Sequence, residues 1–464
     1  MFRRNNRGSR EQDDKTRGKK MEDCSVREKA MRINLSRSKQ LFEIAKTFTP
    51  GGVHSNVRWM EPHPMYFSRG LGAKIWDVDG NEYLDCLGNY GAIVLGHGDP
   101  DVIQAIKQQL DQGLTAGVES ELSIDVARMM TQMIPCCEMV RFSNSGTEAV
   151  MHAIHIARGY TQKERILKAE GNYHGWYDYV YCSNRYPYKD WPLPKPYPSS
   201  QGLCADVVSK TLVVPWNDLE KMEEVINRYK DEIAAVIIEP VSHNIGCALP
   251  KKGYLEGVRE LTVKNNILLI FDEVITGFRP APGGAQEFFR VTPDLATFGK
   301  AIANGFPLSA VAGKRKVMDI INPALNKVSY GGTYNGHQAV IAAASAALEK
   351  LKTGDVQKHL NRLTKKLVNG FNEICARRGA QARMQGIGGK CQVYFTSEEV
   401  VDWRTASGVD QTMYKKFRDG LLERGILWPY SCFSHPSITA AHTDQDIDRI
   451  LATSEEVLTK IAKD

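Results

Sequence analysis

The residue that could most readily take part in catalysis is Lys300. It ends a short apolar run and is followed by small residues and glycine, within residues 296–307. An amine in that position is costly to bury in its charged form. A desolvated amine loses its proton near neutral pH and becomes a nucleophile that can form a Schiff base. A surface lysine at the start of a loop explains the same local residues, so the rest of the chain must decide between the two interpretations.

A second segment with candidate functional residues is 143–149. Here a strand pattern ends in small hydroxyl and glycine residues, and a helix follows to about Arg158. Free backbone N–H groups at a helix start, with the hydroxyls of Ser145 and Thr147 beside them, form a ready site for phosphate. An ordinary helix cap uses the same residue types, and taken alone the segment favours the cap.

The elements that must position these groups are strands. Residues 234–240 and 267–273 are continuous apolar runs that each end in acid, and a helical segment lies between them at about 254–264. Buried strands that alternate with helices predict an α/β fold with a mostly parallel sheet covered on both faces.

Ligands of such sheets bind beyond the carboxyl ends of the strands. Ser145, Glu239, Asp272 and Lys300 all fall at predicted strand ends, and an aromatic-rich loop lies at residues 171–176. A phosphate site, a buried acid, an amine nucleophile and aromatic rings together suit a phosphorylated aromatic aldehyde. Pyridoxal phosphate, which needs a lysine and an acid against its pyridine nitrogen, is therefore the expected cofactor.

The composition is that of a globular protein. The chain has 464 residues, of which 42% are hydrophobic and 25% are charged, and much of its net charge of +6 comes from the N-terminus. This charge does not predict a nucleic-acid footprint. Ten cysteines without C-x-x-C spacing predict neither a zinc site nor a disulfide framework, and we expect no metal. Apolar runs are too short for a membrane span and the N-terminus lacks a secretory core, so a cytoplasmic protein without membrane or nucleic-acid partners is expected.

The sequence predicts four segments. We expect a disordered basic tail over residues 1–33, an N-terminal segment of a small domain over 34–100, a large cofactor-binding domain over 101–345 and a C-terminal small domain over 346–464. Apolar spacing and turn residues further predict a helix over 36–45, a hairpin over 74–85, a helix over 102–110 and a closing helix over 446–463.

Six segments together resemble class III pyridoxal-phosphate-dependent aminotransferases, and within them the glutamate-1-semialdehyde 2,1-aminomutase group. These segments are residues 50–58, 144–149, 173–175, 239–240, 271–279 and 299–300. The resemblance runs from about Ser36 to the C-terminus. It implies fold-type I, which has a mostly parallel central sheet in a large domain and a smaller α/β domain built from both chain ends.

The same resemblance implies roles for single residues. Lys300 would carry the cofactor and move the proton at the substrate α-carbon, and Asp272 would pair with the pyridine nitrogen. The other cofactor contacts implied are Val274 and Tyr173 on the two ring faces, Asn244 at the ring hydroxyl, Ser145, Gly146 and Thr147 at the phosphate, and His174 and Glu239 beside them. Thr333 would reach the phosphate from a second subunit, which implies a homodimer, and Ser55 and Arg58 would hold the substrate carboxylate.

The residues expected to line the substrate side of the cavity, here called the substrate wall, depart from the aminomutase pattern. Ser434 stands where that pattern has a glutamate, residues 303–307 replace a run of glycines, and Tyr90 and Trp176 make the wall more aromatic. We therefore predict an intermolecular aminotransferase that moves an amino group between a carboxylate-bearing amino acid, β-amino acids included, and an oxo acid. The alternative is glutamate-1-semialdehyde 2,1-aminomutase, which transfers the amino group within one molecule, or a related amino-acid epimerase.

Overall fold

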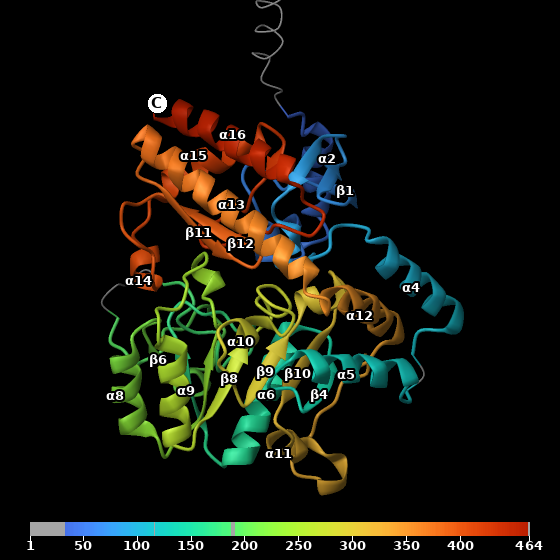
Figure 1. Cartoon of the computed structure of the whole chain (residues 1–464), viewed down its shortest axis with the longest axis vertical. Coiled ribbons are helices and arrows are strands. Elements are labelled where there is room, and N and C mark those ends of the chain that lie inside the picture. The colour runs from blue at the N-terminus through green and yellow to red at the C-terminus, as the bar shows by residue number, and fades with distance from the viewer. Residues whose placement is uncertain (1–32, 116, 187–190, 463–464) are drawn as a thin grey trace, which may run out of the picture.

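A seven-stranded sheet is the centre of the protein (Figure 1). The computed structural model describes residues 33–115, 117–186 and 191–462, so residues 1–32 of the predicted tail lie outside the described residues. The strands are β4 (Met139–Ser143), β5 (Arg165–Ala169), β6 (Thr211–Val214), β7 (Ile233–Ile238), β8 (Leu268–Asp272), β9 (Leu295–Phe298) and β10 (Ser309–Gly313). Their order across the sheet is β4-β10-β9-β8-β7-β5-β6.

Both faces of this sheet are covered by helices, which explains why its strands are continuous apolar runs. On one face Ile237 of β7 packs in a core with Ile154 of helix α6 (Gly146–Thr161). On the other face Val236 of the same strand packs in a core with Val258 of helix α9 (Tyr254–Lys264). Helix α8 (Leu219–Tyr229) contacts β6, and α5 (Glu121–Met133) and α12 (Gln338–Leu351) contact each other at the opposite end of the sheet (Figure 1).

One strand runs against the others. Strand β10 is antiparallel to both of its neighbours, β4 and β9, while β9, β8, β7, β5 and β6 pair in parallel. Strand β4 therefore has the same direction as β9, and the carboxyl ends of six strands meet at one edge of the sheet. The prediction of a mostly parallel sheet is confirmed.

A smaller α/β unit is built from both ends of the chain. Strands β1 (Phe67–Leu71), β2 (Lys74–Asp77) and β3 (Glu82–Asp85) form an antiparallel meander, and β13 (Ile426–Leu427) joins β3 in parallel. The helices of this unit are α2 (Ser36–Ala45), α13 (Asp355–Arg378), α15 (Gln411–Leu422) and α16 (Asp444–Ile461), with the hairpin β11 (Arg383–Ile387) and β12 (Lys390–Tyr394). Figure 1 shows the red and orange C-terminal helices beside the blue N-terminal elements. The fold-type I prediction is confirmed, whereas the exact domain boundaries stay predictions.

The limits of two predicted helices agree with the structure, and those of a third do not. Helices α2 and α9 have the predicted limits, but α4 (Pro100–Gln112) is longer than the predicted 102–110. The reason is that the Asp99 side chain accepts the backbone N–H groups of Asp101 and Val102, with proline at the first helical position. Within the described ranges, none of the helices combines the length and apolar character that a membrane crossing requires.

Candidate active site

The four residues expected at strand ends line one cavity of about 300 Å³ at the carboxyl edge of the large sheet. Ser145 follows β4, Glu239 follows β7, Asp272 ends β8 and Lys300 follows β9. The same cavity is lined by the predicted cofactor residues Gly146, Thr147, Tyr173, His174, Asn244 and Val274. The geometry thus assembles an amine, two acids, a helix N-terminus and an aromatic ring in one place.

Lys300 lies at the start of the short 3₁₀ helix η4 (Lys300–Ala303), with its backbone in the left-handed region at φ 48°. That conformation is uncommon for a residue with a side chain, and such strain clusters at functional sites. Desolvation lowers the pKa of Lys300 to about 8, although the carboxylates of Glu239 and Asp272 act in the opposite direction. An appreciable fraction of the amine is therefore neutral near pH 7 to 8, as a nucleophile requires.

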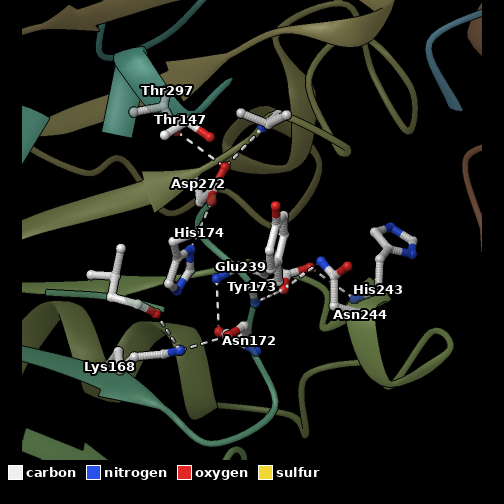
Figure 2. Close-up of polar contacts among 12 residues, drawn as sticks. Thr147, Lys168, Asn172, Tyr173, His174, Glu239, His243, Asn244, Asp272 and Thr297 are labelled. Carbon is white, nitrogen blue, oxygen red and sulfur yellow. Dashed lines mark hydrogen bonds and ion pairs between the residues drawn. The ribbon is translucent and has the colours of Figure 1, made fainter. Parts of the chain in front are cut away.

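Asp272 is buried and held by three donors (Figure 2). Its Oδ2 atom lies 2.7 Å from Nδ1 of His174, while its Oδ1 atom accepts the backbone N–H of Val274 and the hydroxyl of Thr297, each at 3.1 Å. We assign the proton of the imidazole to Nδ1 of His174, which then donates to the Oδ2 atom of Asp272. These contacts fix the orientation of the carboxylate toward the cavity.

Glu239 organises the loop on the other side of the cavity. Its carboxylate accepts the backbone N–H of Tyr173 at 2.8 Å, the side-chain amide of Asn244 at 2.9 Å and the backbone N–H of His243 at 3.0 Å (Figure 2). Burial, followed by the nearby Asp272 carboxylate, raises the pKa of Glu239 to about 7. The acid therefore positions two of the predicted cofactor contacts at once.

The loop that carries Tyr173 is held in place by hydrogen bonds from a buried lysine of the preceding strand. Lys168 of β5 donates from Nζ to the backbone oxygens of Asn172 (2.7 Å), Val180 (3.1 Å) and Cys182 (2.6 Å) and to Oδ1 of Asn184 (2.8 Å). Its burial lowers its pKa to about 8. A lysine in a strand gave no functional signal in the sequence, and its role became visible only from these contacts.

The start of α6 serves as both a helix cap and a potential anion site. Ser145 and Glu148 form a capping box, in which the Ser145 hydroxyl accepts the Glu148 N–H and the Glu148 carboxylate accepts the Ser145 N–H. The amides of Gly146 and Thr147, in the first turn, have no preceding helical carbonyl to bond. Both residues line the cavity, so the cap leaves N–H groups there that an anion could accept from.

Pyridoxal phosphate fits this set of residues. A Cβ atom at Gly175, whose φ is 86°, would lie 2.5 Å from the Thr147 hydroxyl, and one at Gly146 would lie 3.1 Å from Val274. The absence of side chains at these glycines keeps the space beside the helix start open. An anion there, an aromatic ring between Tyr173 and Val274, an acid at Asp272 and an amine at Lys300 match the chemical parts of the cofactor.

The predicted substrate residues are more dispersed. Arg58 and Tyr90 line a second cavity of about 610 Å³, and the Tyr90 hydroxyl hydrogen-bonds to the backbone oxygen of Val57. Ala92, two residues beyond Tyr90, lines the first cavity, so the two cavities share this segment. Ser55 is half-buried and precedes the short helix η2 (Asn56–Arg58).

The remaining two predicted residues lie outside the main cavity. Trp176 is 56% exposed, its ring centroid is 4.3 Å from that of Tyr181, and its backbone N–H donates to the Thr147 hydroxyl at 3.2 Å. Thr333 is exposed before α12 and does not line the cavity of its own chain. Sequence reasoning also missed Arg185, which donates from Nη2 to the backbone oxygen of Asn244 at 3.0 Å.

Comparison with known proteins agrees with this geometry. The family described as aminotransferase class-III matches residues 56–450. A glutamate-1-semialdehyde 2,1-aminomutase from Methanocaldococcus jannaschii is 41% identical over 92% of this chain and 99% of its own length. A protein of the same name from Methanosphaera stadtmanae is 42% identical over 93% of this chain and 100% of its own.

Solved structures point to the same architecture. An ω-transaminase from Sphaerobacter thermophilus superposes with a TM-score of 0.88 at 32% identity, over 93% of this chain and 99% of that one. A transaminase with PLP bound superposes with a TM-score of 0.85 at 29% identity, over 92% of this chain and 98% of that one. Both similarities span nearly the whole of the described fold.

Proposed function

Because this chain belongs to the class III aminotransferase family, whose members are pyridoxal-5'-phosphate-dependent enzymes, we propose that it catalyses intermolecular amino transfer from a carboxylate-bearing amino acid to an oxo acid. The observation that carries the proposal is the cavity in which Lys300 and Asp272 meet beside the N-terminus of α6. When bound there, the cofactor supplies an aldehyde for amines and a ring that withdraws electrons from the substrate.

Residues of the chain bind and orient the cofactor and the substrate and transfer the proton. Lys300, with a pKa of about 8, holds the cofactor and accepts or returns the proton at the substrate carbon that bears the amino group. With the cofactor bound, Asp272, oriented by His174 and Thr297, would pair with the ring nitrogen and would keep a proton on it. The N–H groups of Gly146 and Thr147 would hold the phosphate. Val274 and Tyr173 would contact the two faces of the ring, and the guanidinium of Arg58 would bind the substrate carboxylate.

Two features support transfer between molecules. The substrate wall has Ser434 where the aminomutase pattern has a glutamate, and Trp176 with Tyr181 adds aromatic surface next to Thr147. The S. thermophilus ω-transaminase, at 32% identity and a TM-score of 0.88, is a relative with that type of activity in its name.

The second candidate is glutamate-1-semialdehyde 2,1-aminomutase. The two archaeal relatives of that name are more similar in sequence to this chain, at 41% and 42% identity, than the ω-transaminase is, and this observation favours transfer within one molecule.

One experiment separates the two. The purified holoenzyme is mixed with an amino donor from a panel of α- and β-amino acids, without an oxo acid. We expect the yellow absorbance to fall and one equivalent of oxo product per active site to form, followed by arrest until an oxo acid is added. Sustained conversion of glutamate-1-semialdehyde without any oxo acid would establish the aminomutase instead.

We also propose that the active enzyme is a homodimer in which Thr333 completes the phosphate site of the neighbouring subunit. Two observations support this proposal. Thr333 is exposed, and it does not line the cavity of its own chain that contains the amides of Gly146 and Thr147. Mixed dimers of Lys300→Ala and Thr333→Val chains provide the test. They should contain one intact site per dimer and regain activity that neither parent has, whereas a monomer in solution would reject the proposal.

A further inference from the structure

The segment between the two cavities has an unusual backbone. Four consecutive residues, here called the left-handed turn, have φ angles in the left-handed region: Gly88 (52°), Asn89 (47°), Tyr90 (56°) and Gly91 (90°). Two of them carry side chains, for which this region is strained, and such strain persists only where surrounding contacts hold it. Asn89 and Tyr90 line the second cavity, whereas Ala92, which follows the turn, lines the cofactor cavity. The left-handed turn therefore lies at the boundary between the two cavities.

Arg279 contacts this turn from the large domain. It lies seven residues after Asp272 in the same segment, and its side chain is buried. Its Nη2 atom donates to the backbone oxygen of Gly91 at 2.6 Å and to that of Ile93 at 3.4 Å. A Cβ atom at Gly91 would lie 3.7 Å from this Nη2 atom and 2.3 Å from Nζ of Lys390. The absence of a side chain at Gly91 thus lets two basic groups approach the turn.

The charge of Arg279 has no acidic partner among the described residues. Its two acceptors are neutral carbonyls, and its buried Nε and Nη1 atoms have no hydrogen-bond partner in the described part of the chain. Desolvation lowers the pKa of Arg279 to about 9, which leaves the guanidinium charged at neutral pH. Arg259 differs, since it pairs with Asp294 at 2.7 Å. Because an unpaired buried charge is costly, stability alone does not explain Arg279, and its contacts with the turn suggest another role.

We propose that Arg279 is a positioning residue that holds the left-handed turn against the cofactor cavity and thereby keeps Tyr90 in the substrate wall. The Tyr90 hydroxyl donates to the backbone oxygen of Val57, the residue before Arg58, so a displaced turn also disturbs the proposed carboxylate site. The consequence for the substrate rests on the proposed function, whereas the effect on the turn does not. Substrate binding should therefore depend on Arg279 more than cofactor binding does.

Hydrogen exchange on the holoenzyme without substrate tests the effect on the turn. The amides of Ala92 and Ile93 report on it, because they donate to the backbone oxygens of Asn89 at 3.2 Å and Gly88 at 3.1 Å. In Arg279→Gln we expect these two amides to exchange at least about tenfold faster, as for loss of a hydrogen bond from a charged group, while the amides of β3 change less than about twofold. Arg279→Lys should recover only part of the protection, because an ammonium does not reproduce the guanidinium geometry.

Kinetics and cofactor binding separate positioning from a general structural role. In Arg279→Gln we expect the KM for the amino donor to rise about tenfold, while the dissociation constant of pyridoxal phosphate changes less than about twofold. A residue that only stabilises the fold would weaken donor and cofactor together, and that result would overturn the inference. Arg259→Gln, at an arginine of the same domain whose partner is Asp294, is the control and should change neither the exchange rates nor the KM.

The outcomes distinguish this inference from the proposed function. If the wild type transfers no amino group but exchange at Ala92 and Ile93 still depends on Arg279, the proposed function fails and the positioning role stands. Unchanged exchange at these two amides in folded Arg279→Gln overturns the positioning role. If Arg279→Gln does not fold, the same comparison is made with Arg279→Lys, and wild-type exchange rates in that variant overturn the role equally.

Discussion

The Nδ1 atom of His174 lies 2.7 Å from the Oδ2 atom of Asp272, and both side chains are buried. The histidine follows Tyr173 in the chain, so one short segment supplies both the proposed ring contact and the group that orients the proposed acid Asp272. Removing this donor should therefore disturb the cofactor site without dismantling the fold.

We predict that His174→Phe weakens binding of pyridoxal phosphate about tenfold or more, since a hydrogen bond to a charged group contributes about 1.5–3 kcal/mol. Equilibrium titration of apoenzyme with the cofactor measures the effect. His152→Phe is the matched control, because His152 is also buried but stacks on Tyr330, with ring centroids 3.7 Å apart. Equal losses in the two variants would show that the Asp272 contact is not the cause.

Replacement of Lys300 tests the assignment of the nucleophile. Lys300→Ala should show no yellow absorbance, no borohydride-trappable bond to the cofactor and a loss of turnover of at least about 10²-fold. Lys352→Ala, at an exposed lysine paired with Glu349, should retain all three properties. A Lys300→Ala protein that still traps the cofactor would assign the role to another lysine.

The pKa of Lys300 gives a pH dependence with a defined sign. Only the neutral amine attacks the aldehyde, so the rate at which apoenzyme captures the cofactor should rise with pH through a midpoint near pH 8. The Glu239 carboxylate raises the pKa of Lys300, so Glu239→Gln should move the midpoint of this profile to lower pH. Stopped-flow absorbance measures the rate. Glu220→Gln on α8 serves as the control, and a midpoint that moves upward in Glu239→Gln would contradict the electrostatic account.

The proposed role of Arg58 in binding the substrate carboxylate can be tested by a conservative substitution to lysine. Arg58→Lys should raise the KM for amino acids about tenfold, because an ammonium cannot replace the bidentate fork, with little change for amines that lack a carboxylate. Steady-state kinetics with a matched pair of amino acid and amine decides the point. Wild-type preference for the simple amine would remove the basis of this assignment.

The buried Lys168 should matter for stability more than any surface lysine. Lys168→Met would leave four buried oxygen acceptors without their donor, and we expect a loss of about 3 kcal/mol in the free energy of unfolding. Urea unfolding followed by circular dichroism measures it. Lys210→Met removes an exposed pair with Glu164 and should leave the unfolding midpoint nearly unchanged.

The parts of the fold that could be predicted are those where local and long-range signals agree. Helix α9 was predictable because its apolar face and flanking strands fall at regular spacing, and the meeting of Ser145, Glu239, Asp272 and Lys300 followed from the geometry of parallel sheets. At Ser145, the cap and the anion site were posed as alternatives, whereas the structure shows that one helix start provides both a cap and free amides.

Other features depend on contacts that no local pattern encodes. Strand β5 was not anticipated, because Lys168 interrupts its apolar run and the charge of this lysine is satisfied only by oxygens of the loop that follows the strand. Arg185 gave no signal because an arginine in a tyrosine-rich loop is ordinary. Its position became meaningful only when folding brought Asn244 and Phe433 together.

The pairing of β3 with β13 has a consequence for how the protein is made. Strand β3 ends at residue 85, but its parallel partner begins at residue 426, so the ribosome must translate about nine-tenths of the chain before that edge can be completed. Nascent chains therefore carry an open strand edge throughout most of elongation, a condition that favours association with other chains. Chaperone dependence during translation should accordingly exceed that of the same polypeptide refolded at full length.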